Sequence, residues 1–192
     1  MMTNNELIIQ FKNELERIGG NFSAAESDSD AAAQIIEKAN RYNADSIVFG
    51  GNPKLKNILD LILTAKNFNG KSISEINNLD SDPAILHEKL SKADIGISYA
   101  YCIVAETGSI VLLSSQYEPR SLSLLPGTSI IIANSECVVP ELADALELLQ
   151  KERDFQDLSC MTIISGPSRT ADIEKVLVTG VHGPKDLHVI LI

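Results

Sequence analysis

Residues 160–174 read CMTIISGPSRTADIE, an apolar run that a Gly-Pro turn interrupts. The run from Cys160 to Ile164 has the length and character of a buried strand. After the turn, Ile173, Val176 and Leu177 recur at helical spacing, so the pattern predicts a helix with Ser168 and Thr170 as caps. A strand, a tight turn and a helix in succession are typical of α/β proteins.

The start of this expected helix is a candidate ligand site, because the first N–H groups of a helix are unbonded and carry the positive end of its dipole. Asp172 and Glu174 would repel a free phosphate there, and Arg169 would offset them. A neutral or mixed-charge ligand, or a partner surface, fits better. A second polar turn, residues 179–184, precedes the last apolar run. The two turns predict a ligand-facing edge that contains Gly166, Ser168, Arg169, Thr170, Asp172, Glu174 and Gly183.

The rest of the chain divides into a helical part, residues 1–80, and a core, residues 93–192, which we expect to form one domain. Amphipathic spacing predicts helices over residues 7–18, 29–42, 53–62, 82–92 and 140–149, and apolar runs predict strands over 46–49, 94–98, 102–105, 110–114 and 129–133. The strands show no clean alternation, which favours an α/β fold with a largely parallel sheet covered by helices. The polar stretch over residues 66–82 is the expected flexible connection.

The composition limits the classes of partner. The formal charge is −10, from 26 acidic and 16 basic residues, which argues against nucleic acid or an anionic membrane surface as the main partner. No apolar run approaches the ~18 residues of a membrane span, and no secretory signal is visible at residue 1. We therefore expect a cytoplasmic protein.

The cysteines and histidines predict no metal site on this chain. Cys102, Cys137 and Cys160 are widely separated and form no CxxC motif, so we expect reduced thiols in core packing and no iron–sulfur cluster held by this chain. His182 lies in a turn, where it could act as a donor or base, but its spacing from Asp172 and Glu174 matches no recognised metal pattern. His188 is expected to be structural, and His87 to face solvent.

Glu106 and Arg120 are the other candidate functional residues. Glu106, Thr107 and Gly108 form a tight turn between two apolar runs, and a partly desolvated Glu106 would have a raised pKa suited to acid, base or nucleophile. The alternative is a hairpin turn whose glutamate is solvated or pairs with Arg120. Arg120 is the only basic residue between Lys92 and Lys151, so it either holds a carboxylate or phosphate or forms a salt bridge with Glu106 or Glu118.

Five motifs together resemble the LUD domain family: ADIGI at 93–97, AETGS at 105–109, RSLSLLP at 120–126, GPSRTADIE at 166–174 and GVHGP at 180–184. The resemblance implies a Rossmann-like sheet of the type found in sugar-phosphate isomerases and CoA-transferases. It also implies a part in oxidising L-lactate to pyruvate, with companion proteins that carry the iron–sulfur centres. Class I CoA-transferases use a glutamate in a Glu-x-Gly turn, which Glu106-Thr107-Gly108 resembles.

Three functions are therefore open. The first is a binding or assembly subunit that holds a small organic acid or contacts iron–sulfur partners. The second is an independent enzyme of acyl- or CoA-transfer type with Glu106 as nucleophile. The third is isomerisation of a sugar phosphate, which the scarcity of clustered lysine and arginine disfavours. The first two require the Glu106 turn, Arg120 and the two proline turns to line a common crevice.

Overall fold

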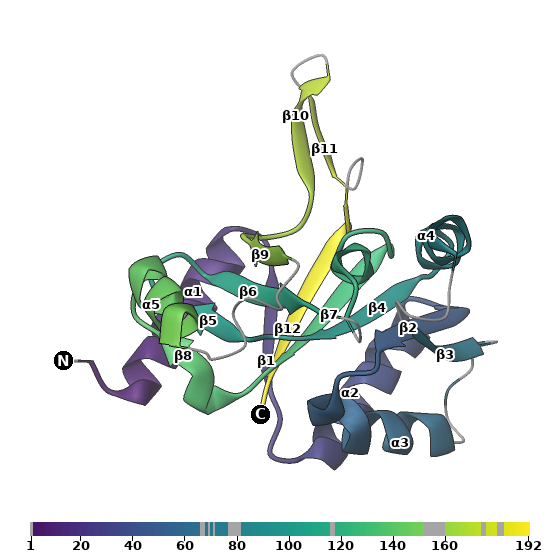
Figure 1. Ribbon diagram of the computed structural model, residues 1–192, viewed down its shortest axis with the longest axis horizontal. Coiled ribbons are helices and arrows are strands. Elements are labelled where there is room, and N and C mark those ends of the chain that lie inside the picture. The colour runs from purple at the N-terminus through teal and green to yellow at the C-terminus, as the bar shows by residue number, and fades with distance from the viewer. Residues whose placement is uncertain are drawn as a thin grey trace.

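The computed structural model describes residues 2–65, 68, 70, 72–76, 82–115, 118–151, 160–173, 176–179 and 183–192. Its centre is a six-stranded sheet in the order β1-β12-β7-β4-β2-β3, and every pairing in it is parallel (Figure 1). The strands are β1 (Asn21–Ala24), β12 (Asp186–Leu191), β7 (Thr128–Ala133), β4 (Ile95–Tyr99), β2 (Ser46–Gly50) and β3 (Ser72–Ile76). The predicted α/β class and parallel sheet are confirmed.

Two helices cover one face of this sheet. They are α2 (Asp28–Arg41) and α3 (Lys56–Thr64), the latter preceded by a short 3-10 turn, η1 (Pro53–Leu55). The α2 helix begins where the Ser27 side chain accepts a hydrogen bond from the N–H of Asp30, and its Ile35 and Ile36 are buried. This face of the helices packs against alternate strand residues such as Ile47 and Phe49, as expected for a strand buried on both sides.

The opposite face is covered in two parts. Over β12 and β7 lie α1 (Asn4–Arg17) and a second sheet in the order β8-β5-β6-β9, whose outer side packs against α5 (Leu142–Lys151). The strands of this sheet are β5 (Cys102–Val104), β6 (Ser109–Ser114), β8 (Val138–Val139), which follows the 3-10 turn η3 (Ser135–Cys137), and β9 (Cys160–Ile164). Over β2 and β4 lie α4 (Pro83–Ser91) and the 3-10 turn η2 (Arg120–Ser123). β5 and β6 therefore lie outside the parallel sheet.

The helix predicted after Ser168 is wrong. The strands β10 (Arg169–Ile173) and β11 (Val176–Thr179) pair antiparallel instead and project away from the body of the molecule (Figure 1). Five of the nine residues in these strands are β-branched, and such residues favour extended backbone: Thr170, Ile173, Val176, Val178 and Thr179. Ser168 and Thr170 thus cap no helix, and the anion seat predicted at a helix start does not exist.

The polar stretch at 66–82 also differs from the expectation. It contains β3, the edge strand of the parallel sheet, where we expected only a flexible connection. Most of its other residues lie outside the described part of the chain. Residues 1–80 contribute β1, β2 and β3 to the same sheet as the core, so the N-terminal part is more than helical. Among the described helices, none is long and apolar enough to cross a bilayer.

Candidate functional site

The two proline turns meet in space. The N–H of Ser168 donates to the carbonyl of Pro184 at 2.9 Å, and Gly183 packs against the Ser168 side chain. A cavity of about 220 Å³ lies beside them, and we call it the corner cavity. Its lining includes Gly166, Ser168 and Gly183 from the predicted ligand-facing edge, with Ser123 and Thr162. Three of the residues predicted for the ligand-facing edge thus line a hollow between two loops, although no helix starts there.

Ser129 also lines the corner cavity, and it is a residue that the sequence analysis missed. Its side chain is buried, and its hydroxyl has no hydrogen-bond partner among the described residues. A buried hydroxyl of this kind is usually satisfied by water or a ligand. Its place inside the apolar run of β7 offers no sequence signal, because a single serine in a buried strand is common.

The C-terminal end of α1 supports one side of this region. Gly166 has a φ of +84°, and a side chain there would come within 2.9 Å of the Ile18 carbonyl. Gly19, with a φ of +88°, leaves the space that the Arg169 guanidinium occupies. A cation is stabilised at this position, because the C-terminal end of a helix carries partial negative charge. The structure therefore places the Arg169 guanidinium beside Gly19, just after the C-terminal end of α1.

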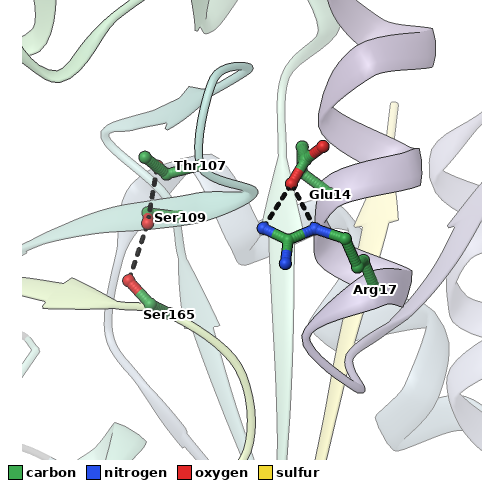
Figure 2. Close-up of polar contacts among 5 residues, drawn as sticks. All are labelled: Glu14, Arg17, Thr107, Ser109 and Ser165. Carbon is green, nitrogen blue, oxygen red and sulfur yellow. Dashed lines mark hydrogen bonds and ion pairs between the residues drawn. The ribbon is translucent and has the colours of Figure 1, made fainter.

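The Glu106 turn reaches the corner region through a row of hydroxyls (Figure 2). Thr107 Oγ1 donates to Ser109 Oγ at 2.8 Å, and Ser109 Oγ is 2.7 Å from Ser165 Oγ. Gly108 has a φ of +63° and packs directly on the backbone of α1, next to the Glu14–Arg17 ion pair that Figure 2 shows. Thr107 is thus linked through Ser109 to Ser165, which lines the corner cavity, but neither Thr107 nor Gly108 lines that cavity.

The Glu106 side chain itself is exposed, and its backbone N–H donates to the carbonyl of Pro140 at 3.0 Å. This geometry is the solvated hairpin turn that the sequence left open as one interpretation. The carboxylate faces solvent rather than a closed pocket.

Arg120 lies next to the corner cavity rather than in it. It is exposed at the start of η2 and lines a narrow pocket that shares Ser123 and Thr162 with the corner cavity. Among the described residues, its guanidinium forms no ion pair with Glu106 or Glu118. The salt-bridge interpretation is therefore wrong for these two partners, and Arg120 is available at the rim.

Glu118 is a second residue that the sequence analysis missed as a site residue. It is only 8% exposed, and its carboxylate accepts hydrogen bonds from Asn52 Nδ2 at 2.7 Å and from the N–H of Tyr99 at 2.6 Å. Burial raises the pKa of this carboxyl, and the two hydrogen bonds partly oppose that shift. Asn52 and Tyr99 lie at the carboxyl ends of β2 and β4, so one buried carboxylate joins two strand ends.

The remaining candidates can be placed only in part. His182 and Glu174 lie outside the described residues, and Thr170 and Asp172 are described only as backbone in β10. His188 is buried 2.7 Å from the Tyr42 hydroxyl, which confirms a structural position, and His87 is exposed as expected. Among the side chains that the structure describes, no three of the types His, Cys, Asp and Glu lie together as metal ligands would.

The cysteines fit core packing to different degrees. Cys102 is buried, and burial raises the pKa of its thiol to about 12. Cys137 and Cys160 are half-buried, and all of these thiols are free.

An open parallel sheet with helices on both faces and a second small sheet defines an α/β protein, and family comparison identifies it further. The LUD domain profile matches residues 8–192. The chain belongs to the LUD domain family. The crystal structure of a DUF162 family protein from Deinococcus radiodurans is similar in fold, with a TM-score of 0.69, 18% identity, and coverage of 100% of this chain and 99% of that one.

Curated relatives cover much of the chain. Lactate utilization protein C of Shouchella clausii is 34% identical over 181 residues, which are 93% of this chain and 76% of that protein. Protein YkgG of Escherichia coli, which is uncharacterized, is 34% identical over 163 residues, 82% of this chain and 67% of that protein. Lactate utilization protein C of Halalkalibacterium halodurans is 48% identical over 101 residues, 52% of this chain and 44% of that protein. The aligned part of the chain thus spans from 44 to 76% of the length of these relatives.

Proposed function

We propose that this chain is a cytoplasmic subunit of a system that oxidises L-lactate to pyruvate, and that it docks companion proteins carrying iron–sulfur clusters. The names of its relatives support a role in lactate utilization, since lactate utilization protein C of Shouchella clausii aligns with 93% of this chain. The three widely placed thiols are consistent with electron-transfer centres on the partners rather than here.

The observation that carries the docking role is the apolar rim of the corner cavity. Leu124 is 36% exposed and Ile163 is 39% exposed, and both line this cavity. Ile163 belongs to β9, which ends the order of its sheet and pairs with β6 alone among the described strands. Exposed apolar side chains on an unpaired strand edge are typical of a surface that a protein partner covers.

The hairpin β10–β11 extends this surface. It projects from the body of the molecule (Figure 1), and it begins directly after Ser168, which lines the corner cavity. It pairs with no other described strand. A two-stranded hairpin by itself is at most marginally stable in water, so contact with a partner would stabilise it. The proposed docking surface therefore consists of Leu124, β9 and this hairpin.

Ile163→Asp is expected to abolish recovery of the iron–sulfur partners when the tagged chain is purified from cells grown on L-lactate. A charge placed in a desolvated contact costs about 2 kcal/mol or more, which lowers affinity at least ~30-fold. Leu124→Asp should act in the same direction. Ile85→Asp is the matched control, because Ile85 is 62% exposed on α4 and does not line the corner cavity. Equal recovery with Ile163→Asp and Ile85→Asp would exclude the docking role.

The second candidate function is acyl or CoA transfer by Glu106. The observation that favours it is the turn itself, where Gly108 holds a left-handed conformation against α1 and leaves the Glu106 carboxylate open to a ligand. Incubation with an acyl-CoA followed by borohydride or hydroxylamine would trap a Glu106 thioester. We expect no adduct, because the exposed carboxylate is not activated by desolvation. An adduct that is absent from Glu106→Gln would establish the transferase instead.

A further inference from the structure

The carboxyl ends of β2 and β4 form a second place where a ligand can bind. These strands are neighbours in the sheet, yet their outgoing connections go to opposite faces. The chain after β2 enters α3, which packs with Ile47 and Phe49. The chain after β4 enters β5, which packs with Ile131 and Ala133 on the other face. In open α/β sheets, such a divergence opens a crevice at the carboxyl ends of the two strands, and ligands bind there.

The structure contains two cavities at this place. One has a volume of about 110 Å³ and is lined by Asn52, Lys54, Tyr99, Tyr101 and Glu118 among others. The other has a volume of about 360 Å³, and its walls include Phe49, Leu59 and Leu63. They meet at Asn52, which lines both. We call the two together the strand-end crevice, and no residue of the corner cavity lines it.

The cavity of about 110 Å³ has residues of opposite charge in its lining. The acidic residue, Glu118, is buried, with only 8% of its surface exposed. The Lys54 side chain is exposed, and its Nζ lies 5.1 Å from the centre of the Tyr99 ring. Asn52 connects the Glu118 carboxylate to the backbone of Lys54. Its Oδ1 accepts a hydrogen bond from the N–H of Lys54 at 3.1 Å, and its Nδ2 donates one to Glu118 at 2.7 Å. An ionised carboxylate has about four acceptor positions, so Glu118 can accept further donors from a ligand.

We propose that the strand-end crevice binds a small 2-hydroxy carboxylate, with the ligand carboxylate on Lys54 and its hydroxyl donating to Glu118. The pattern of an exposed cation and a buried acceptor matches a molecule with an anionic end and a neighbouring donor. A cavity of about 110 Å³ suits a molecule of that size. The choice of a hydroxy acid over an amino acid rests on the proposed function, because lactate is a 2-hydroxy carboxylate.

Calorimetric titration of the purified chain with L-lactate tests this site. Lys54→Met and Glu118→Gln are each expected to weaken binding about tenfold or more, the typical effect of losing a charge-assisted hydrogen bond. Propionate, which lacks the hydroxyl, should bind the wild-type chain about tenfold more weakly for the same reason. Lys54→Met is informative even if Glu118→Gln impairs folding, because Lys54 is exposed.

Two control variants separate this site from others. Lys92→Met removes an exposed lysine at the C-terminal end of α4 that lines neither cavity of the crevice, and it should leave the affinity unchanged. Ser129→Ala removes the unpaired hydroxyl of the corner cavity and should also leave it unchanged. No saturable heat, or binding that Ser129→Ala weakens and Lys54→Met does not, would overturn the proposal. The capture of iron–sulfur partners does not depend on this result, so the two proposals can fail separately.

Discussion

Gly108→Ala is expected to lower the free energy of unfolding by about 3 kcal/mol, since it combines a left-handed backbone with a steric overlap. Gly108 has a φ of +63°. A methyl group there would overlap the backbone N of Leu15 and lie 2.6 Å from the Glu14 carbonyl carbon and 2.8 Å from the Leu15 Cα. Because these atoms belong to the backbone of α1, no side-chain rotation can relieve the contact. Urea denaturation of the two proteins measures the difference.

Gly127→Ala is the matched control for this prediction. The closest atom to a methyl group at Gly127 is the Asp94 carbonyl at 3.5 Å, which is ordinary contact, and its φ is not in the left-handed region. The expected change is within about 0.5 kcal/mol. Similar losses at both positions would contradict the packing of the Glu106 turn on α1, and with it the support that α1 gives to the corner cavity.

Acidification is expected to cost the wild-type protein up to about 3 kcal/mol through His188 alone, by the linkage between pKa shifts and stability. Burial, with smaller contributions from Lys38 and Arg41, lowers the pKa of His188 from 6.5 to about 4. The unfolded chain therefore takes up the proton first as the pH falls. The stabilisation by neutral His188 is fully present above pH 6.5 and is lost as the pH falls to about 4.

The pH dependence of His188→Phe isolates this contribution. Glu118 acts in the opposite direction, because its raised folded pKa means that its stabilising contribution is present at low pH and lost as the pH rises. The difference in unfolding free energy between wild type and His188→Phe removes the Glu118 effect, which both proteins share. We expect the wild type to lose stability relative to His188→Phe on going from pH 6.5 to pH 4. A difference independent of pH would show that His188 is not held neutral by its surroundings.

Most of the architecture could be predicted from local patterns. The spacing of Leu7, Phe11 and Leu15 predicted α1, and these three side chains are buried in the structure. The apolar runs that became β2, β4 and β7 predicted a parallel sheet, because strands buried on both faces need apolar residues at every position. Helices and buried strands are decided by periodicity over many residues, which a sequence displays directly.

Two elements could not be predicted in this way. The hairpin β10–β11 has too few apolar residues to separate a period of two from a period of 3.6, so Ile173, Val176 and Leu177 fitted a helix as well as a strand. The edge strand β3 reads Ser72-Ile73-Ser74-Glu75-Ile76, and its polar residues resemble a loop. Both are decided by pairing with other strands rather than by local preference.

The candidate site was predicted in part. The meeting of residues 166–168 with Gly183, and the link from Thr107 through Ser109 to Ser165, follow the expectation that distant turns share one region. Glu118 could not be recognised, because its partners Tyr99 and Asn52 lie 19 and 66 residues away in the chain. A carboxylate in a polar stretch before a proline looks like any solvated loop residue until the fold brings those strand ends to it.

Site-specific photo-cross-linking tests the central proposal, that the surface around the corner cavity docks the iron–sulfur partners. A photoreactive phenylalanine analogue at Ile163 would be activated in cells growing on L-lactate, with the same analogue at Ile85 as the control. Both side chains are exposed, so both sites tolerate the analogue. We predict that residue 163 cross-links to a protein with iron–sulfur centres and that residue 85 does not. Cross-links to that protein from residue 85, with none from residue 163, would contradict the proposal.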